Sequence, residues 1–452
     1  MKKARIRTGF SFSSSNGRAA IAICALALAF ASTLFCSVYP TVSAQSAGAV
    51  RNFYLAVEYD LGGPGYVVFS PQTLVVQQGD QVNITVRNVE TQSLQLQIEG
   101  QPAVTVQPGS AAAAGVVPAE TSVPVFTAST PGILGFFTTE HPEASGQIVV
   151  LPSDWTNYRP PAQTRGFTQL ALPDFAGEEY DKFFPGIMVV NQGDSVNVSV
   201  RSLDEMPHSF TMPSYGVNAA VNPAQMAANG TLTPVTSTVP EFKATKPGVF
   251  TFICTTYCGE GHIEMVGCLV VLPTGSGYNP EPTTQYGYLT VKPDFAGEGY
   301  DKFIPDVVFA NQNDLVYLKV RNTDGVAHSL SLPDFGIDNE PIPPAQNTTA
   351  GLAPTDAYIT PFFADKPGVF QFFCSTLCGE GHNEMIGYLA VLPALGSTVT
   401  ASPSPSAPPP SFSPPPTQPG PVSAAVAVGL SVAALLAGVG IGLALASKYE
   451  ES

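Results

Sequence analysis

The stretch Val196-Asn197-Val198-Ser199-Val200 alternates apolar and polar residues at every position. A period of two is typical of a β-strand that buries only one of its faces. Val82-Asn83-Ile84-Thr85-Val86 shows the same alternation, and turn signals such as Lys246-Pro247-Gly248 lie between strands of this kind. No sustained helical period interrupts the pattern. The sequence therefore predicts an all-β fold.

Two segments of the chain recur at a fixed distance. Pro173-Asp174-Phe175-Ala176-Gly177-Glu178 returns as Pro293–Glu298, and Lys246–Phe250 returns as Lys366–Phe370; both offsets are 120 residues. Self-similarity at a constant period indicates that one structural unit is repeated along the chain. The sequence therefore contains at least two copies of the same module.

A third, fainter copy lies upstream of these two. Gly79-Asp80 and Arg87-Asn88 match Gly193-Asp194 and Arg201-Ser202 at an offset of 114. A module of roughly 100 residues with seven or eight short strands favours a β-sandwich. We therefore expect three tandem Greek-key β-sandwiches, named modules one, two and three, at residues 50–152, 166–273 and 286–393.

Both ends of the chain carry long apolar runs. Residues 1–18 are basic, an apolar run follows, and small residues lead up to Ala44. This order predicts a signal peptide at residues 1–44, although the run is long enough to remain as an anchor. The apolar run at 422–446 predicts a transmembrane helix that follows a Pro/Ser-rich stalk at 394–421. We expect a single-pass protein of the cell membrane with its domains on the extracytoplasmic side.

The composition excludes one class of partner. The chain has 19 basic and 35 acidic residues, which leaves a formal charge of −16. Nucleic acid is not an expected partner, because phosphate binding requires a basic face. Hydrophobic residues make up 44% of the chain, enough for sizeable cores. An acidic surface can instead steer a basic redox partner.

Modules two and three each contain a dense run of sulfur and nitrogen donors. Residues 254–265 and 374–385 share the pattern C-x3-C-G-x-G-H-x2-M, and a further His lies 46 residues before the first Cys of each run. Thiolates, imidazoles and a thioether together suit copper, whereas zinc accepts Cys₂His₂ but makes little use of Met. The expected metal ligands are His208, Cys254, Cys258, His262 and Met265 in module two, and His328, Cys374, Cys378, His382 and Met385 in module three.

The four donors that are close in sequence share one predicted loop between two strands. Gly259 and Gly261 allow this loop to turn tightly around an ion. Two neighbouring thiolates can bridge two metal ions, with one His on each ion. A Cys pair in an exported protein is more often a disulfide. The complete donor pattern occurs twice, however, and this favours metal binding.

Each motif resembles the binuclear Cu-A centre of cytochrome c oxidase subunit II and of nitrous oxide reductase, which is carried by a cupredoxin sandwich. The resemblance covers both modules almost end to end and includes every side-chain ligand. It implies a further ligand, the backbone carbonyl of the second residue after the first Cys, at Thr256 and Thr376; the oxidase family usually has Glu there. It also implies two binuclear Cu-A centres, or about four copper ions per chain.

Module one keeps the strand pattern but not the donors. Leu94 stands where His208 stands in module two, and Thr138 stands where Cys254 stands. The corresponding loop is shorter and retains His141 as its single candidate ligand, which we interpret as a surface histidine. We expect module one to be free of copper and to have a structural or docking role.

The number of histidines limits the chemistry. Four of the five are assigned to the two motifs, so only His141 remains, which is too few for a trinuclear copper cluster, and no C-x-x-C-H motif for haem attachment occurs. We predict no catalytic residue, and we expect membrane-anchored copper electron transfer, with a cytochrome, a small blue copper protein or a terminal oxidase as redox partner. One alternative is an atypical cytochrome c oxidase subunit II-like component, the electron-entry subunit of a haem-copper oxidase. The other is a copper storage or delivery protein.

Overall fold

The computed structural model describes residues 48–112, 115–228, 230–275, 277–349 and 351–394, which all belong to one compact unit. The predicted signal peptide, the transmembrane helix and all of the stalk beyond its first residue lie outside this part. Within the described residues, no helix has both the length and the apolar character needed to cross a membrane. Strands β1 to β36 dominate, and the described helices are short 3-10 turns, so the all-β prediction is confirmed.

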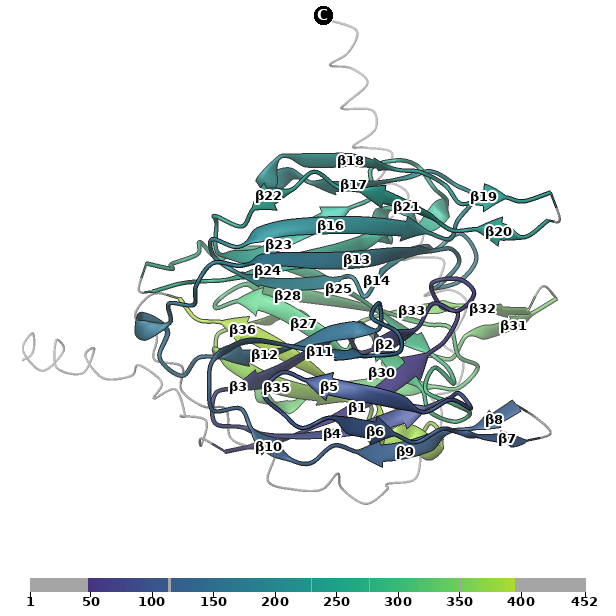
Figure 1. The fold of residues 1–452 in the computed structure, drawn as a ribbon, viewed down its shortest axis with the longest axis horizontal. Coiled ribbons are helices and arrows are strands. Elements are labelled where there is room, and N and C mark those ends of the chain that lie inside the picture. Colours follow the sequence, from purple (N-terminus) through teal and green to yellow (C-terminus); the bar gives the residue numbers. More distant parts are fainter. Residues whose placement is uncertain (1–47, 113–114, 229, 276, 350, 395–452) are drawn as a thin grey trace, which may run out of the picture. The chain divides into compact units, whose positions relative to one another are not determined.

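Each module contains two five-stranded sheets, and the first two modules have the same strand order (Figure 1). In module one (β1–β12) the strands are β1 (Val50–Glu58), β2 (Val68–Ser70), β3 (Thr73–Gln77), β4 (Gln81–Asn88), β5 (Leu94–Ile98), β6 (Val104–Val106), β7 (Ser110–Ala112), β8 (Gly115–Val117), β9 (Ala119–Ser122), β10 (Phe126–Thr127), β11 (Gly132–Thr138) and β12 (Ser145–Leu151). In module two (β13–β24) they are β13 (Thr164–Leu172), β14 (Lys182–Phe184), β15 (Ile187–Asn191), β16 (Ser195–Ser202), β17 (His208–Met212), β18 (Val217–Val221), β19 (Gln225–Met226), β20 (Leu232–Thr233), β21 (Val235–Thr238), β22 (Phe242–Lys243), β23 (Gly248–Ile253) and β24 (Val266–Leu272).

Module three (β25–β36) repeats this order once more. Its strands are β25 (Thr284–Lys292), β26 (Lys302–Ile304), β27 (Val307–Asn311), β28 (Leu315–Asn322), β29 (His328–Leu332), β30 (Ile337–Ile342), β31 (Gln346–Thr348), β32 (Gly351–Ala353), β33 (Thr355–Tyr358), β34 (Phe362–Phe363), β35 (Gly368–Phe373) and β36 (Ile386–Leu392). The 3-10 turns are η1 (Trp155–Asn157), η2 (Pro213–Tyr215), η3 (Glu260–Glu264), η4 (Pro333–Phe335) and η5 (Glu380–Glu384).

The alternating stretch Val196–Val200 belongs to β16, which lies in the middle of one sheet. Val196, Val198 and Val200 are buried, whereas Asn197 is exposed. β16 pairs in parallel with β13 on one side and antiparallel with β21 and β22 on the other. The period of two therefore reports a sheet that buries one face, as predicted.

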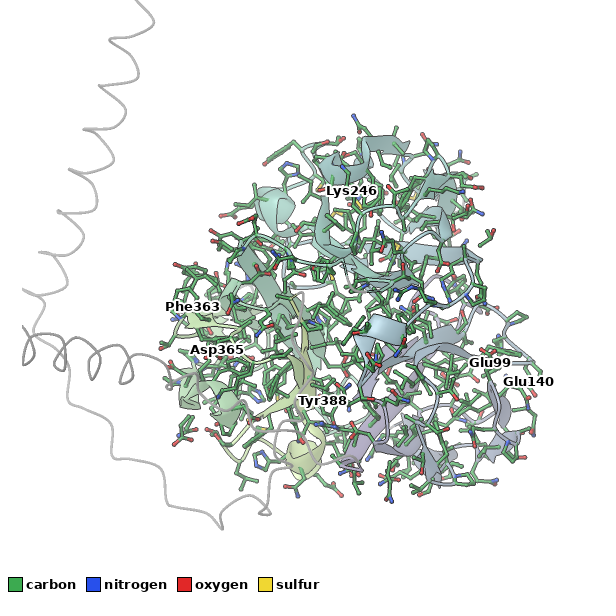
Figure 2. The ribbon with its side chains drawn as sticks, turned by 90° about the vertical axis from the view of Figure 1, so that its left-hand side faces the viewer. Glu99, Glu140, Lys246, Phe363, Asp365 and Tyr388 are labelled. Carbon is green, nitrogen blue, oxygen red and sulfur yellow. The ribbon has the colours of Figure 1, made fainter. Side chains whose placement is uncertain are left out.

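The three modules pack against one another through equivalent strands. Val75 of β3, Val189 of β15 and Phe309 of β27 occupy corresponding positions and belong to a single buried apolar cluster. Tyr388 of β36 reinforces the contact between modules three and one, because its hydroxyl donates to the carbonyl of Asn52 (2.8 Å) and its ring packs on Phe53. Figure 2 labels Tyr388 between the ribbons of these two modules.

Three arginine–tyrosine contacts between modules run in one direction around a closed cycle. The arginine near the end of β4, β16 or β28 packs in each case on a tyrosine ring of another module. The arginine of module one contacts a tyrosine of module three, that of module three contacts one of module two, and that of module two contacts one of module one. Interfaces of this head-to-tail kind close into a ring when their rotation allows it. The pairs are Arg87 with Tyr300, Arg321 with Tyr180, and Arg201 with Tyr66.

Candidate metal centres

The donor-rich loop of module two connects β23 to β24 and contains the turn η3. Gly259 has a φ of 140°, and a Cβ at this position would lie 2.9 Å from the carbonyl oxygen of Glu179. A Cβ at Gly261 would collide with the ring of Tyr180. The two glycines therefore let the loop lie flat against the segment before β14, and they hold Cys258, His262 and Met265 over the end of the sandwich.

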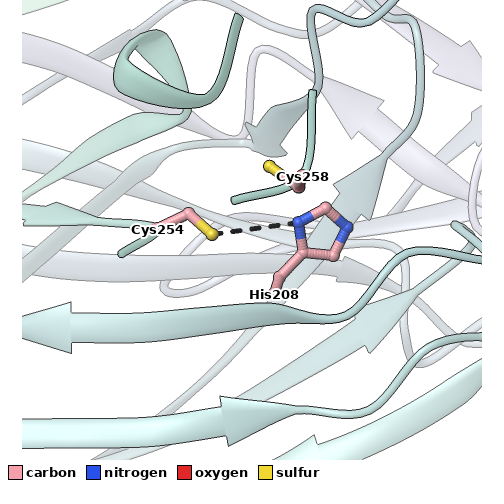
Figure 3. Close-up of side chains that lie close together, drawn as sticks. All are labelled: His208, Cys254 and Cys258. Carbon is pink, nitrogen blue, oxygen red and sulfur yellow. Dashed lines mark hydrogen bonds between the residues drawn. The ribbon is translucent and has the colours of Figure 1, made fainter. Parts of the chain in front are cut away.

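The predicted ligands of module two converge at this end. Sγ of Cys254 lies 3.9 Å from Nδ1 of His208, which β17 supplies (Figure 3). Ligand atoms of these two residues and Sγ of Cys258 all lie within 4.8 Å of one another. Cys258 in turn lies 3.9 Å from Nδ1 of His262 and 4.0 Å from Sδ of Met265. The structure thus brings together all five side-chain donors that the sequence assigned to this module.

The backbone also reaches the sulfur atoms. The carbonyl oxygen of Thr256 lies 3.1 Å from Sγ of Cys254, where the resemblance places a carbonyl ligand. The amide of Ser209 donates to the same sulfur at 3.4 Å. The side chains of Cys254, His208 and Met265 are buried, so the sulfur cluster is largely closed to water.

Module three repeats the arrangement at corresponding positions. Sγ of Cys378 lies 3.6 Å from Nδ1 of His382 and 3.9 Å from Sδ of Met385. The carbonyl oxygen of Thr376 lies 3.1 Å from Sγ of Cys374. Nδ1 of His328 is buried and has no hydrogen-bond partner, although it belongs to the same group of donors as the two sulfurs. A buried nitrogen without a partner is the feature that a metal ion at this position would satisfy.

The described cysteines, Cys254, Cys258, Cys268, Cys374 and Cys378, are all free thiols. The two pairs in the donor loops therefore do not form the disulfides that were the alternative interpretation. Cys268 lies on β24 outside the donor loops, and burial raises its pKa to about 12, so this thiol carries little thiolate at neutral pH.

The donor loops favour a thiolate. The hydrogen bond from Cys258 lowers the pKa of Cys254 to about 3, against the opposing effect of burial, and the pKa of Cys258 rises for the same reason. Burial also works against a charged His208, but hydrogen bonds to Asp204 and Cys254 outweigh it and raise the pKa of the imidazole to about 9. Both shifts, a lowered pKa of Cys254 and a raised pKa of His208, favour the thiolate that metal binding requires.

Two carboxylates that were not predicted from the sequence orient the first histidine of each site. Nε2 of His208 lies 2.9 Å from Asp204, and Nε2 of His328 lies 2.9 Å from Asp324. Because Nε2 is held by a carboxylate, Nδ1 is left facing the sulfurs, as in many metal sites. Both aspartates stand four residues before their histidine at the 120-residue offset, so the repeat itself contained the signal.

A buried lysine supports each donor loop from below. Nζ of Lys182 donates to the carbonyl oxygen of Glu264 at 3.1 Å, and Nζ of Lys302 reaches the carbonyl oxygen of Glu384 at 3.5 Å. Each glutamate directly precedes the methionine that is a predicted ligand of its module. Burial lowers the pKa of Lys182 to about 8. The sequence analysis did not identify these lysines either, since a lone lysine at a strand start carries no distinct pattern.

The outer side of the module-two site is apolar. Tyr257 and Ile263 are exposed, and the Tyr257 ring lies 6.0 Å from that of His262. Leu377 takes the place of Tyr257 in module three and is also exposed. In module two the second histidine thus lies beside the exposed ring of Tyr257.

Module one places other residues at the corresponding positions. Leu94 and Thr138 are fully buried. His141 is partly buried rather than lying free on the surface, because its Nδ1 lies 3.2 Å from Glu143 and its ring packs edge-on to that of Tyr59. The interpretation of His141 as a surface histidine therefore holds only in part.

Comparison with known proteins gives one short stretch of similarity in sequence. No family model matches the chain. A segment of 87 residues, 19% of this chain, is 33% identical to the nitrous-oxide reductase of Stutzerimonas stutzeri, and 85 residues are 36% identical to that of Cupriavidus necator. The matched part spans only 12% of the length of either enzyme.

Solved structures of copper proteins align with a larger part of the chain but only loosely. The copper-containing nitrite reductase of Thermus scotoductus covers 76% of this chain and 99% of its own, with 18% identity and a TM-score of 0.20. A multi-copper oxidase from Pseudomonas thermotolerans covers 76% and 100%, with 13% identity and a TM-score of 0.21. TM-scores this low establish neither fold nor function.

Proposed function

We propose that modules two and three are cupredoxin-like sandwiches, that each holds a binuclear copper centre of the Cu-A type, and that the chain passes single electrons through these centres. The observation that carries the proposal is the convergence, in both modules, of two thiols, two imidazole Nδ1 atoms, a thioether and one backbone carbonyl. Soft sulfur combined with imidazole favours copper over harder or strictly tetrahedral metals. The similarity to nitrous-oxide reductase over part of the chain supports the same assignment.

The protein itself contributes a rigid site that is largely closed to water. Bound copper would supply a one-electron redox couple. Asp204 and Asp324 fix the first histidine, and Lys182 and Lys302 bind the loop backbone. Burial of Cys254, Cys258 and Cys374 limits the access of water to the sulfurs. Ligands that are held in place and need not rearrange between oxidation states favour fast electron exchange.

The arrangement favours electron transfer over catalysis. Three cavities of about 340, 80 and 20 Å³ lie among the described residues, and none of them is lined by a predicted ligand. These three cavities therefore offer no substrate pocket at the sulfurs. The exposed apolar residues next to His262 instead offer a contact surface for a redox protein, and the acidic chain would steer a basic partner. We place this surface outside the cell membrane, with the C-terminal segment as the anchor.

Counting electrons tests this proposal. The copper-loaded full chain is titrated with a one-electron reductant while its copper content is measured on the same sample. We expect about one electron for every two copper ions, since each pair shares one redox step. One electron per copper would indicate separate mononuclear sites, and copper that accepts no electrons reversibly would favour storage or delivery.

A further inference from the structure

Module one has lost its donors but keeps a contact to the donor loop of module three. Arg87, the seventh residue of β4, is buried, and its guanidinium lies 3.2 Å from the centroid of the Tyr300 ring. Its Nη2 also donates to Oε1 of Glu384 at 2.9 Å and to Glu120 of its own module. A buried guanidinium stacked on a ring and bonded to a carboxylate fixes both groups in position.

The two groups of module three that Arg87 contacts, Tyr300 and Glu384, each lie next to a predicted ligand in the chain or in space. Tyr300 packs so closely on Gly381 that a Cβ there would lie 2.3 Å from a ring carbon, and Gly381 immediately precedes His382. Glu384 immediately precedes Met385, and its carbonyl accepts from Lys302. Arg87 thus restrains the loop at two points, one next to the imidazole ligand and one next to the thioether ligand.

Module one makes a second contact of the same kind. Nζ of Lys302 donates to the carbonyl oxygen of Tyr54 on β1 at 3.2 Å and lies over the Tyr54 ring. The lysine that supports the module-three loop is therefore itself held by module one. This contact does not involve Arg87 and points to the same role.

The equivalent arginines at the other two interfaces between modules serve as comparisons for Arg87. One of these interfaces includes a donor loop, and the other does not. Arg321 of module three stacks on Tyr180 at 3.3 Å beside Gly261, and Lys319 pairs with Glu264, so the loop of module two is restrained in the same manner. Arg201 of module two lies 4.9 Å from the Tyr66 ring and donates to the carbonyl of Gly62. Arg201 thus serves an interface that carries no cysteine loop.

We propose that Arg87 is a positioning residue for the module-three centre, so that the module without ligands completes the metal site of another module. This inference rests on the proposed copper centre where the test measures copper affinity or reduction potential. It does not rest on it where the test measures the reactivity of Cys378 in the metal-free chain. Outer-shell partners of metal ligands typically change metal affinity by about 10- to 100-fold when removed. We expect an effect of this size at the module-three centre alone.

The test uses the full chain with one centre removed at a time. Cys258→Ser leaves the module-three centre, and Cys378→Ser leaves the module-two centre. Each of these two cysteine variants is then combined with one of three arginine substitutions: Arg87→Gln, Arg321→Gln or Arg201→Gln. In the Cys258→Ser background, Arg87→Gln should weaken copper binding by about tenfold or more and shift the reduction potential. Arg321→Gln should do so only in the Cys378→Ser background, and Arg201→Gln in neither.

A second readout requires no metal. In the metal-free, reduced chain the rate at which iodoacetamide modifies Cys378 reports how often the loop opens. Arg87→Gln should raise this rate by about tenfold, whereas Arg201→Gln should leave it within about twofold. Arg87→Lys, which keeps the charge but not the flat stacking surface, should restore part of the protection. If Arg87→Gln does not fold, Glu384→Gln removes the acceptor alone and is measured in its place.

The outcomes separate the two proposals. If the Cys258→Ser chain with Arg87 intact binds no copper, the proposed function fails, while the alkylation rates still decide the inference. If copper binds but Arg87→Gln and Arg201→Gln act equally on both centres, or if neither changes Cys378 reactivity, Arg87 has no positioning role and the inference is overturned.

Discussion

Modules one and two have the same sheets and nearly the same strand register, yet only module two has metal donors at the end of its sandwich. β12 pairs with β3 in module one as β24 pairs with β15 in module two. Thr138 and Leu94 are buried where Cys254 and His208 converge in the other module. The sandwich therefore does not depend on the donors, and a module can lose its own site while still supporting that of another.

The largest expected effect is the loss of one metal centre, caused by a single cysteine substitution that leaves the other centre in place. Cys258→Ser removes a thiolate that both ions of the module-two centre would share, so copper per chain should fall by about half while the module-three centre is retained. The measurement is copper content together with the optical spectrum. The matched Cys378→Ser variant should retain the module-two centre. Loss of both centres from either variant would mean that the modules do not bind metal independently.

A core substitution should cost about the same in a module with a site as in one without. Phe136 of module one and Phe252 of module two are buried and pack against Gly146 and Gly267 in the same way. Replacing either with Ala should lower the free energy of unfolding of the metal-free chain by about 3–5 kcal/mol. Chemical denaturation followed by fluorescence measures the change. A much smaller cost in module one would show that its core is the looser of the two.

The carboxylates behind the histidines should have an intermediate effect. Asp204→Asn leaves an amide in place of the carboxylate that fixes His208, and copper affinity at the module-two centre should fall by about 10- to 100-fold. Competition with a copper chelator measures this change, and Asp324→Asn should act in the same way on module three. The structure gives module one no histidine at this position, and an Asp204→Asn chain with unchanged affinity would show that the hydrogen bond is not needed.

The smallest effect concerns the contact between modules three and one. Tyr388→Phe removes only the hydroxyl that donates to Asn52, and unfolding should become easier by about 1 kcal/mol. Cys268, the counterpart of Tyr388 in module two, makes no such bond, and Cys268→Ala is the control. Thermal unfolding distinguishes the two. A Tyr388→Phe chain as stable as the wild type would indicate that this bond contributes nothing net.

The sequence was informative wherever a pattern was both local and repeated. The alternation in β16 predicted a sheet with one buried face, and the 120-residue offset made His328 a counterpart of His208. The ten side-chain donors were predicted in this way, because a short loop contains four of them in each module and an identical spacing adds the distant histidine.

The arginines and lysines that were missed, unlike Asp204 and Asp324, act on residues far away in the sequence. Arg87 and Arg201 served only as markers of the repeat, since nothing in a single module shows that they contact another one. Lys182 is a buried charge that becomes intelligible only beside the carbonyl of Glu264. Such contacts depend on how whole modules pack, and no periodicity within a strand encodes them. The predicted membrane segments, redox partners and module boundaries stay predictions.

The central claim is that two modules each hold a pair of coppers that share one electron and that the third module holds none. Electron paramagnetic resonance on the copper-loaded full chain tests it most directly, with copper quantified on the same sample. The account predicts a hyperfine pattern from one electron spread equally over two copper nuclei, at about four coppers per chain. A pattern from single copper ions, or a chain that binds no copper with its cysteines reduced, would contradict it.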